Sequence, residues 1–449
     1  MIPLEEALAT VLQDASPLAP VSVPLDEALG QVAASAVVAA GPVPPFANSA
    51  MDGYAVRAGD VAGAPVTLAV TGTVTAGRVG GPLLPGRAIR IMTGAPVPDG
   101  ADAVCMVEHT TTSPDGAEVV IEQPVAAGEN VRAAGEDLAA GQPVLQAGTV
   151  LQPAHLGVLA NIGAATVSVH PRPRVGVLST GDELVEAGGT LIPGTVYDAN
   201  RHSLLAAVTA AGGDPVDLGV VPDDQDVLVE TFRRAGDRCD LVLSSGGVSV
   251  GDLDVVRLVL ERVADPLRWM QVAIKPAKPL AFGRLRPSGT PMLGLPGNPV
   301  SALVSFELFA RPLLRCLAGH RPARPAPWRA VTDAPISRRP DGKTHFLRAR
   351  LQVGADGRLT VATVGSQGSH QLFATASANA VVAVPDGTGV PAGTVLDVLA
   401  LSGTALLIGT GADRSAADGL ATISTSPPAA AGPSPRWSTA GRATTAGAS

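Results

Sequence analysis

From Arg172 onward, short uninterrupted apolar runs alternate with longer segments whose apolar residues recur at helical spacing. An apolar run without polar alternation is typical of a strand that is buried on both faces of a sheet. Repeated strand–helix units predict an open, mostly parallel α/β sheet that helices cover on both faces. The expected strands are 175–178, 216–221, 241–243, 272–274 and 291–295, and the expected helices are 200–211, 226–234, 255–263 and a long one that ends at 317.

Other parts of the chain show different patterns. Residues 57–139 hold short β-like runs broken by Gly and Pro, which predicts a small all-β module. Residues 336–401 predict a second β module, after a Pro/Arg-rich linker. The strands of the first module are expected at 66–70, 88–92, 103–107 and 119–121, and further helices are expected at 4–12, from Leu25 to Leu29 and from Pro153.

Composition narrows the class of protein. The chain has 449 residues, 46% hydrophobic and 16% charged, which indicates a soluble globular protein of several domains. The net charge is -8 without a basic run, which argues against nucleic acid as the main partner. No apolar run reaches membrane-helix length, and three scattered cysteines without metal-ligand spacing favour a reducing cytoplasm. The segment beyond about residue 409 is too poor in apolar residues to order itself, so a disordered tail is expected.

Polar loops follow several of the expected strands. Ligands of open α/β sheets bind at the carboxyl ends of the strands, so these loops are expected to converge in space. The convergence would place acidic side chains and two lysines along one rim of the sheet, the edge at which the parallel strands end. These residues are Asp182, Glu183, Asp223, Asp224, Asp252, Asp254, Lys275 and Lys278.

The loop Ser244-Ser245-Gly246-Gly247 lies between an expected strand and an expected helix. This arrangement directs backbone N–H groups toward an anion, and the carboxylates that follow suit a divalent metal. The pattern predicts a phosphate-bearing ligand held together with a metal ion. A tight turn before a solvated helix start is the alternative.

Two further loops carry polar residues. In Pro296-Gly-Asn-Pro-Val-Ser301, Asn298 is expected to cap a helix that opens at Pro299, with free N–H groups facing the rim. In the stretch 42–56, prolines force extended backbone before polar residues crowd around Met51. A surface turn with apolar anchors remains the alternative for that stretch.

His155 has no second His or Cys at ligand spacing, so a surface position is expected.

Five motifs in this order resemble the molybdopterin molybdenumtransferase family, and the C-terminal part of gephyrin is similar. They are Ser-Ala-Met-Asp-Gly-Tyr-Ala at 49–55, Met-Thr-Gly-Ala at 92–95, Ser-Thr-Gly-Asp-Glu-Leu at 179–184, Ser-Ser-Gly-Gly-Val-Ser-Val-Gly-Asp at 244–252 and Leu-Pro-Gly-Asn-Pro-Val-Ser at 295–301. The likeness covers about residues 1–402. Several long motifs in register are far more specific than one glycine motif.

The resemblance implies a reaction and an assembly. Members of the family insert molybdate into adenylylated molybdopterin with Mg²⁺ and release AMP, which yields the molybdenum cofactor. They form elongated homodimers, whose active cleft lies between the α/β domain of one subunit and the β module around Asp52 of the other. A molybdopterin adenylyltransferase is implied as a further partner.

The resemblance also implies four segments, and composition adds the tail as a fifth. The expected order is an elongated linker and dimerisation domain, an inserted β module, an α/β molybdopterin-binding domain, a C-terminal barrel-like β module and a tail. The corresponding ranges are 1–45 with 140–170, 46–139, 171–319, 320–402 and 403–449.

Site residues are carried over by motif. Acidic and hydroxyl positions on the partner-facing module match Asp52, Thr93 and Asp137, and the acid of the Gly-Asp-Glu-Leu motif matches Glu183. Carboxylates for Mg²⁺ and nucleotide phosphate match Asp223 and Asp254, and a lysine pair near the oxyanion matches Lys275 and Lys278. Cofactor binding is expected at Ser244, Ser245, Gly246, Gly247, Ser249, Pro296, Gly297, Asn298, Ser301, Arg348 and Ser369.

Two departures from the family pattern lie beside the lysine pair. Gln271 stands where some members carry another lysine, and Ala277 replaces a common glycine, which would stiffen the loop.

Two other functions stay open. Adenylylation of molybdopterin from ATP needs only the α/β domain, and a pterin-binding scaffold without turnover needs no catalytic acids.

Overall fold

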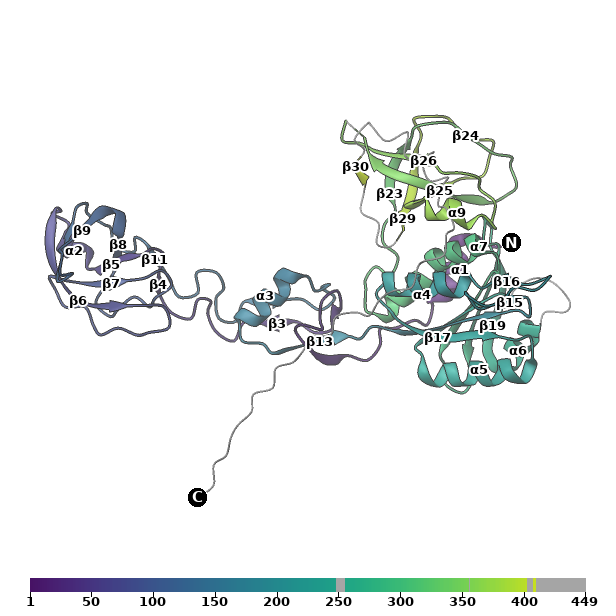
Figure 1. Ribbon diagram of the computed structural model, residues 1–449, viewed down its shortest axis with the longest axis horizontal. Helices are drawn as coiled ribbons and strands as arrows, with labels where there is room; N and C mark the ends of the chain where they lie inside the picture. The colour runs from purple at the N-terminus through teal and green to yellow at the C-terminus, as the bar shows by residue number, and fades with distance from the viewer. Residues whose placement is uncertain (248–254, 355, 402–406, 409–449) are drawn as a thin grey trace, which may run out of the picture.

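The computed structural model describes residues 1–247, 255–354, 356–401 and 407–408. Ser249, Asp252 and Asp254 of the expected site lie outside these residues. The molecule is elongated, with a β module at one end, a slender connecting region in the middle, and an α/β domain and a β-barrel together at the other end (Figure 1).

The central sheet is open and mostly parallel, as expected. The expected strand 272–274 is wrong: Val272 forms an isolated bridge to Ile2, and Ile274 begins the short strand β20 (Ile274–Lys275), which pairs with residues 344–345 outside this sheet. Its strands run in the order β17–β14–β18–β22–β21–β19. The first four are parallel to one another, whereas β21 is antiparallel to both of its neighbours. Because β19 and the parallel strands point the same way, their carboxyl ends share one edge. The bounds are β14 Arg174–Thr180, β17 Asp214–Val221, β18 Leu241–Ser245, β19 Ala264–Gln271, β21 Pro279–Leu285 and β22 Pro291–Leu295.

Helices cover both faces of this sheet. A core cluster containing Phe232 and Val259 joins α5 and α6 to one face, and a second containing Leu204 and Phe309 joins α4 and α7–α8 to the other. A π-helical turn, Phe306–Ala310, interrupts the long C-terminal helix just before Pro312, which lacks a backbone N–H. The helices are α4 Asn200–Ala210, α5 Gln225–Arg238, α6 Val255–Val263, α7 Pro299–Ser305 and α8 Arg311–Leu317, and the short pair β15 Leu184–Val185 and β16 Val196–Tyr197 precedes α4.

The first helix packs with the α/β domain. Ala7, Leu8 and Val11 of α1 (Leu4–Leu12) belong to the same core cluster as α4 and α8. Residues 1–45 were expected in the connecting domain, whereas this helix packs against α8 and the preceding π-helical turn, because its apolar face is buried there.

The connecting region is a small three-stranded sheet with one helix, α3 (Pro153–Asn161). The helix expected from Leu25 is wrong: these residues form turns before Gly30, whose φ of +78° ends any helical path. His155 closes a capping box, since its Nδ1 accepts the Gln152 N–H at 3.0 Å. The strands are β1 Val21–Pro24, β2 Val32–Ala33 and β13 Thr166–His170, with the pair β3 Val37–Val38 and β12 Pro143–Leu145 beside them.

The distal module is a six-stranded sheet in the order β8–β5–β7–β6–β10–β9. Its core holds Tyr54, Leu68 and Val119. Gly53 allows β5 and β8 to approach, because a Cβ there would lie 2.0 Å from the Cys105 carbonyl oxygen. The elements are β4 Asn48–Ser49, β5 Gly53–Val56, α2 Ala58–Val61, β6 Val66–Val74, β7 Arg87–Ile91, β8 Ala103–Met106, η1 Val107–His109, β9 Thr110–Thr112, β10 Glu118–Ile121 and β11 Val131–Arg132.

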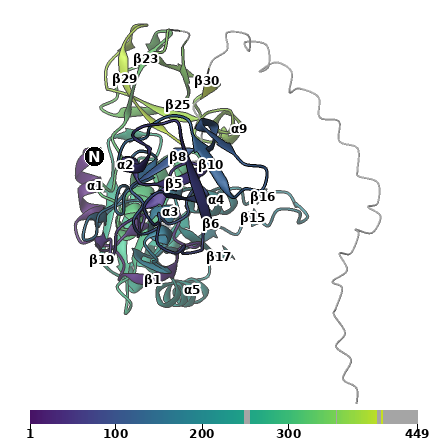
Figure 2. The same cartoon turned by 90° about the vertical axis from the view of Figure 1, so that its left-hand side faces the viewer.

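The C-terminal module is a closed barrel. The strands β25–β26–β23–β29–β27 are paired in sequence, and β27 pairs back to β25. Viewed end-on, the barrel stands on one side of the α/β domain and α5 lies on the opposite side (Figure 2). The elements are β20 Ile274–Lys275, β23 Trp328–Thr332, β24 Ile336–Ser337, β25 Thr344–Val353, β26 Leu359–Thr363, α9 Leu372–Ala376, β27 Ala380–Val384, β28 Gly389–Val390, β29 Val395–Ala400 and β30 Leu407–Ile408.

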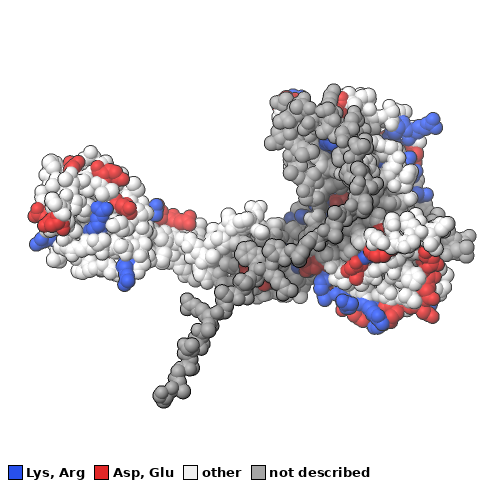
Figure 3. Space-filling view, in the orientation of Figure 1, with Lys and Arg blue, Asp and Glu red and all other residues white. Residues whose placement is uncertain are grey.

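Charged side chains gather at the two ends of the molecule, and the connecting region between them is mostly uncharged on the face shown (Figure 3). Within the described ranges, no helix combines the length and apolar character required to cross a bilayer.

Candidate active site at the edge of the α/β sheet

The loops after three neighbouring parallel strands touch one another. The Gly246 N–H donates to the Leu295 carbonyl at 3.1 Å. A Cβ at Gly246 would lie 2.9 Å from the Thr180 carbonyl oxygen, and one at Gly247 would lie 2.2 Å from Val256 Cβ. Both residues have positive φ, +101° and +68°, so glycine is required here on two grounds. The loops after β14, β18 and β22 thus form one continuous edge.

Asn200, at the start of α4, connects two of these loops. Its Nδ2 donates to Ser245 Oγ at 2.8 Å and to the Gly297 carbonyl at 2.6 Å. Two residues earlier, the buried Asp198 accepts the Ser179 hydroxyl at 2.9 Å at the end of β14. The sequence pattern did not single out Asn200, although the polar pair Asp198 and Asn200 at a helix start was a usable signal.

An acidic part of the edge lies after β14 and β17. Asp182 Oδ1 accepts the Asp223 N–H at 3.1 Å, which brings the two acidic residues side by side. The Glu183 carboxylate folds back onto Gly181, where a Cβ would lie 2.4 Å from Oε2. All three acidic side chains are exposed. Asp224 was expected to face the ligand, but instead it caps α5 by accepting the N–H groups of Asp226 and Val227.

A cavity of about 660 Å³ separates this edge from the barrel. It is built by the loop between β20 and β21, the start of α7 and the barrel segments that face them. No Asp or Glu lines it among the described residues, so its side walls are basic and neutral. The polar and charged lining residues are Lys275, Lys278, Asn298, Ser301, Lys343, His345, Gln367 and Ser369, and Pro296 also lines it.

The lysines of this cavity are exceptional in the chain. Of 32 basic residues other than His, 29 are arginine, and the remaining three are Lys275, Lys278 and Lys343. All three line the cavity. Lys343 and His345 were not predicted as site residues, although the scarcity of lysine was a signal that could have indicated Lys343.

The loop that carries the first two lysines has an unusual backbone. Ala277 has a φ of +73° and is buried. An L-residue in this conformation costs about 1–2 kcal/mol, and its methyl group restricts the loop more than glycine would. Ala277 therefore stands in a conformation that favours glycine, and the stiffening of the loop stays a prediction.

Arg348 lies behind the cavity wall and does not line the cavity. Its guanidinium donates to the carbonyls of Ser366, Gln367 and Gly368, and only 1% of the residue is exposed. It was expected to contact the cofactor. In the structure it instead shapes the loop that presents Ser369, because a buried guanidinium takes up the carbonyls that a tight loop leaves unpaired.

The start of α7 also differs from expectation. Pro299 opens the helix, but Asn298 makes no capping hydrogen bond and its side chain lines the cavity. The Val300 N–H donates to the Ser369 carbonyl at 3.1 Å, so the barrel already uses one of the N–H groups expected to face the ligand.

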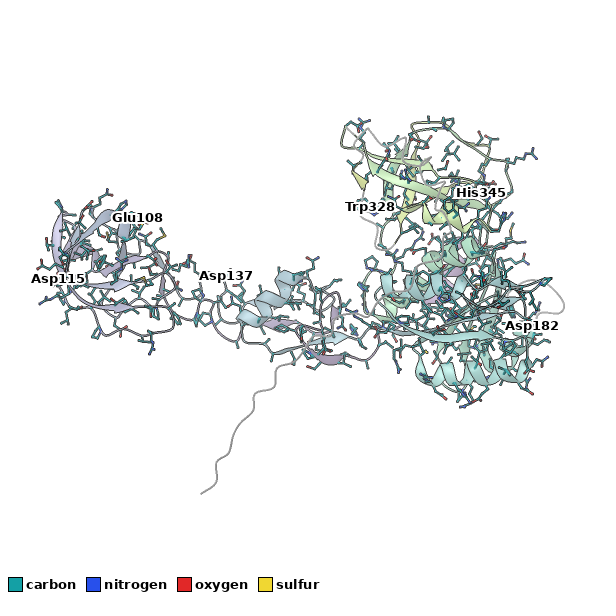
Figure 4. All side chains as sticks on the ribbon, viewed as in Figure 1. Glu108, Asp115, Asp137, Asp182, Trp328 and His345 are labelled. Atoms are coloured by element: carbon teal, nitrogen blue, oxygen red, sulfur yellow. The ribbon has the colours of Figure 1, made fainter. Side chains whose placement is uncertain are left out.

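Three expected residues lie far from this cavity in the same chain. Asp52 and Thr93 belong to the distal module, and Asp137 lies where that module meets the connecting region, whereas Asp182 and His345 lie at the opposite end (Figure 4). Asp52 Oδ1 accepts both the Thr93 N–H at 2.7 Å and the Thr93 hydroxyl at 2.9 Å. These bonds lower the pKa of Asp52, so it is a carboxylate at neutral pH.

Asp341 organises the basic side of the cavity. Its carboxylate accepts bonds from Arg338 at 2.7 Å, His345 at 3.1 Å and Lys343 at 3.3 Å. The hydrogen bond from His345 is the main reason that the pKa of Asp341 falls from 3.8 to about 2.

Asp341→Asn should destabilise the protein at neutral pH by about 1 kcal/mol, in the range of partly exposed ion pairs. A depressed carboxyl pKa contributes stability that is present above pH 3.8 and is lost as pH falls toward 2. The difference in thermal midpoint between wild type and Asp341→Asn should therefore shrink between pH 4 and pH 2. A difference that stays constant over this range would contradict the expected ionisation.

Fold and site together define a multidomain α/β protein with a lysine-lined cavity between an open sheet and a barrel. Family models match almost the whole described chain: the MoeA N-terminal region (domain I and II) at residues 2–163, a probable molybdopterin binding domain at 176–316 and the MoeA C-terminal region (domain IV) at 329–401.

Individual relatives agree. The chain is 39% identical over 366 residues to molybdopterin molybdenumtransferase of Haemophilus influenzae, which covers 81% of this chain and 89% of that protein. It is 44% identical over 394 residues to molybdopterin molybdenumtransferase 2 of Mycobacterium tuberculosis, which covers 84% and 94%. A crystal structure of a molybdopterin biosynthesis MoeA protein from Pyrococcus horikoshii superposes with a TM-score of 0.71 at 30% identity, over 89% of this chain and 99% of that one. The chain belongs to the molybdopterin molybdenumtransferase family, as its motifs indicated.

Proposed function

We propose that this protein inserts molybdate into adenylylated molybdopterin, releasing AMP, and that the lysine-lined cavity binds the molybdate. The observation that carries the proposal is the composition of the cavity wall: three lysines, His345 and no carboxylate among the described residues. Molybdate is a tetrahedral dianion, and ammonium groups with rotatable donors suit such a shape. Ser301 and Ser369 supply hydroxyl donors in the same cavity.

The adjoining edge of the sheet fits the nucleotide part of the substrate. Gly246 and Gly247 leave the backbone accessible, and Ser245 presents a hydroxyl whose oxygen already accepts from Asn200. The proton of that hydroxyl is then available to a phosphate oxygen. Ser244 and Gly297 belong to the same proposed binding edge. The motif serine Ser249 lies outside the described residues and is proposed as a binding residue from the motif alone.

Asp182 and Asp223 fit the requirements of Mg²⁺. This ion takes one or two carboxylates and fills its remaining positions with water and phosphate oxygens, so a cage of three protein ligands is unnecessary. No such cage occurs among the described residues. Bound there with Asp254, Mg²⁺ would neutralise charge on the phosphoanhydride. Glu183 would orient the same region, and Lys275 and Lys278 would hold molybdate next to it.

We further propose a cytoplasmic homodimer in which the partner subunit supplies the residues of the distal module. Asp137 lies where the distal module meets the connecting region, away from the cavity (Figure 4), and Asp52 and Thr93 belong to the distal module itself. A second copy, packed antiparallel along the connecting region, would bring the partner's Asp52 to the edge of the sheet. The first four of the five expected segments would then serve dimerisation, closure of the site, pterin binding and oxyanion binding, and the tail would have no part in the site.

The direct test is a reconstituted reaction. Purified protein with adenylylated molybdopterin, Mg²⁺ and molybdate should release AMP in step with the appearance of cofactor that activates a molybdenum-free apoenzyme. Omission of molybdate should abolish active cofactor. Release of pyrophosphate from ATP and molybdopterin would instead support adenylyl transfer, and binding of the pterin without AMP release would support a scaffold.

A further inference from the structure

Lys343 is the cation of the cavity that no motif assigned. It lies directly before β25, which pairs in parallel with β20 so that Ile274 is opposite Thr344 and Lys275 is opposite His345. Side chains of paired residues lie on the same face, and alternate residues of a strand share a face. This register places Lys275 and His345 on one side of the joint between sheet and barrel, and Lys343, just before the strand, lines the same cavity.

The alternative role for Lys343 is an ordinary ion pair with Asp341. Two observations make that role insufficient. Asp341 already accepts bonds from Arg338 at 2.7 Å and from His345 at 3.1 Å, so its charge is compensated without Lys343. The Lys343 side chain is only 21% exposed, which is unusual for a lysine that serves only to solvate a surface.

The Lys343 ammonium also retains donor capacity. It makes one long contact, 3.3 Å, to Asp341 Oδ2, and an ammonium group has three donors. A chain that uses arginine at 29 of 32 basic positions keeps lysine at the three positions that surround this cavity. A compact charge on a flexible stem can turn toward a small tetrahedral oxyanion, whereas a planar guanidinium favours bidentate partners.

We propose that Lys343 is a third oxyanion-binding residue, which pairs with Asp341 in the free protein and turns to molybdate on binding. The inference rests on the proposed function, because it adds a residue to the proposed molybdate site. It assigns Lys343 a role in affinity for molybdate and none in binding the pterin nucleotide.

Kinetics of Lys343→Ala test this assignment. The KM for molybdate should rise about tenfold, as expected for loss of a charged hydrogen bond, with the KM for adenylylated molybdopterin unchanged. Lys343→Arg should recover part of the loss. Arg339→Ala is the matched control, since it removes the same charge from the same exposed loop outside the cavity. An unchanged KM for molybdate in Lys343→Ala, or an equal rise in Arg339→Ala, would overturn the inference.

Amine labelling gives an independent measurement. Because the side-chain amines of the chain number three, limited acetylation followed by mass spectrometry can follow each of them with and without molybdate. Molybdate should slow modification of Lys275, Lys278 and Lys343 and leave the α-amino group unaffected. Protection of the first two without Lys343 would overturn this inference alone. Protection of none, together with absence of turnover, would overturn the proposed function and this inference with it.

Discussion

Lys275→Ala and Lys278→Ala should each lower kcat/KM for molybdate insertion by about a hundredfold or more. Both side chains line the cavity and make no ion pair within the described part of the chain. Their charge is therefore available to an anion. Removing one preorganised donor from a developing or bound oxyanion typically costs about 3–4 kcal/mol in such sites. Molybdate-dependent AMP release, measured at several molybdate concentrations, checks this expectation.

The matched control is Arg268→Ala. Arg268 is exposed on β19, the strand that leads into the same loop, and it does not line the cavity. This variant removes an equal charge at a neighbouring position, so it reports any general electrostatic effect of the acidic chain. Equal losses in Arg268→Ala and Lys275→Ala would show that the lysines act through net charge and not at the cavity.

The parallel part of the fold could be predicted from the sequence. Strand 291–295 and helix 255–263 have the predicted bounds, because uninterrupted apolar runs and strong helical periodicity leave little choice. The strands β19 and β21 could not be predicted. Their residues are interrupted by Pro, Arg and Gly, and pairing across the edge of the sheet stabilises them more than any local pattern does.

The site residues show the same limit. The rule that ligands bind at strand carboxyl ends grouped Lys275 and Lys278 with the loop after β22, and Pro296 and Asn298 of that loop line the same cavity. It could not distinguish side chains that face a ligand from those that support a loop. Asp224 caps a helix and Arg348 binds carbonyls, because each satisfies backbone groups that the sequence does not display. Asn200 was missed for the same reason.

Mixing two inactive variants should restore activity if the site is shared between subunits. Asp52→Asn keeps the size of the side chain and removes its charge, and Lys275→Ala disables the cavity, so each should be nearly inactive alone. After subunit exchange at equal concentrations, half of the dimers are mixed, and each mixed dimer has one site free of both lesions. Activity should therefore return to about a quarter of the wild-type value.

A mixture of Lys275→Ala and Lys278→Ala should stay inactive, because both lesions belong to the same domain and every site keeps one. If the first mixture also stays inactive while a tagged mixed dimer can be isolated, Asp52 does not complete the partner's site. Its place in the distal module of the same chain would then argue against any role in catalysis.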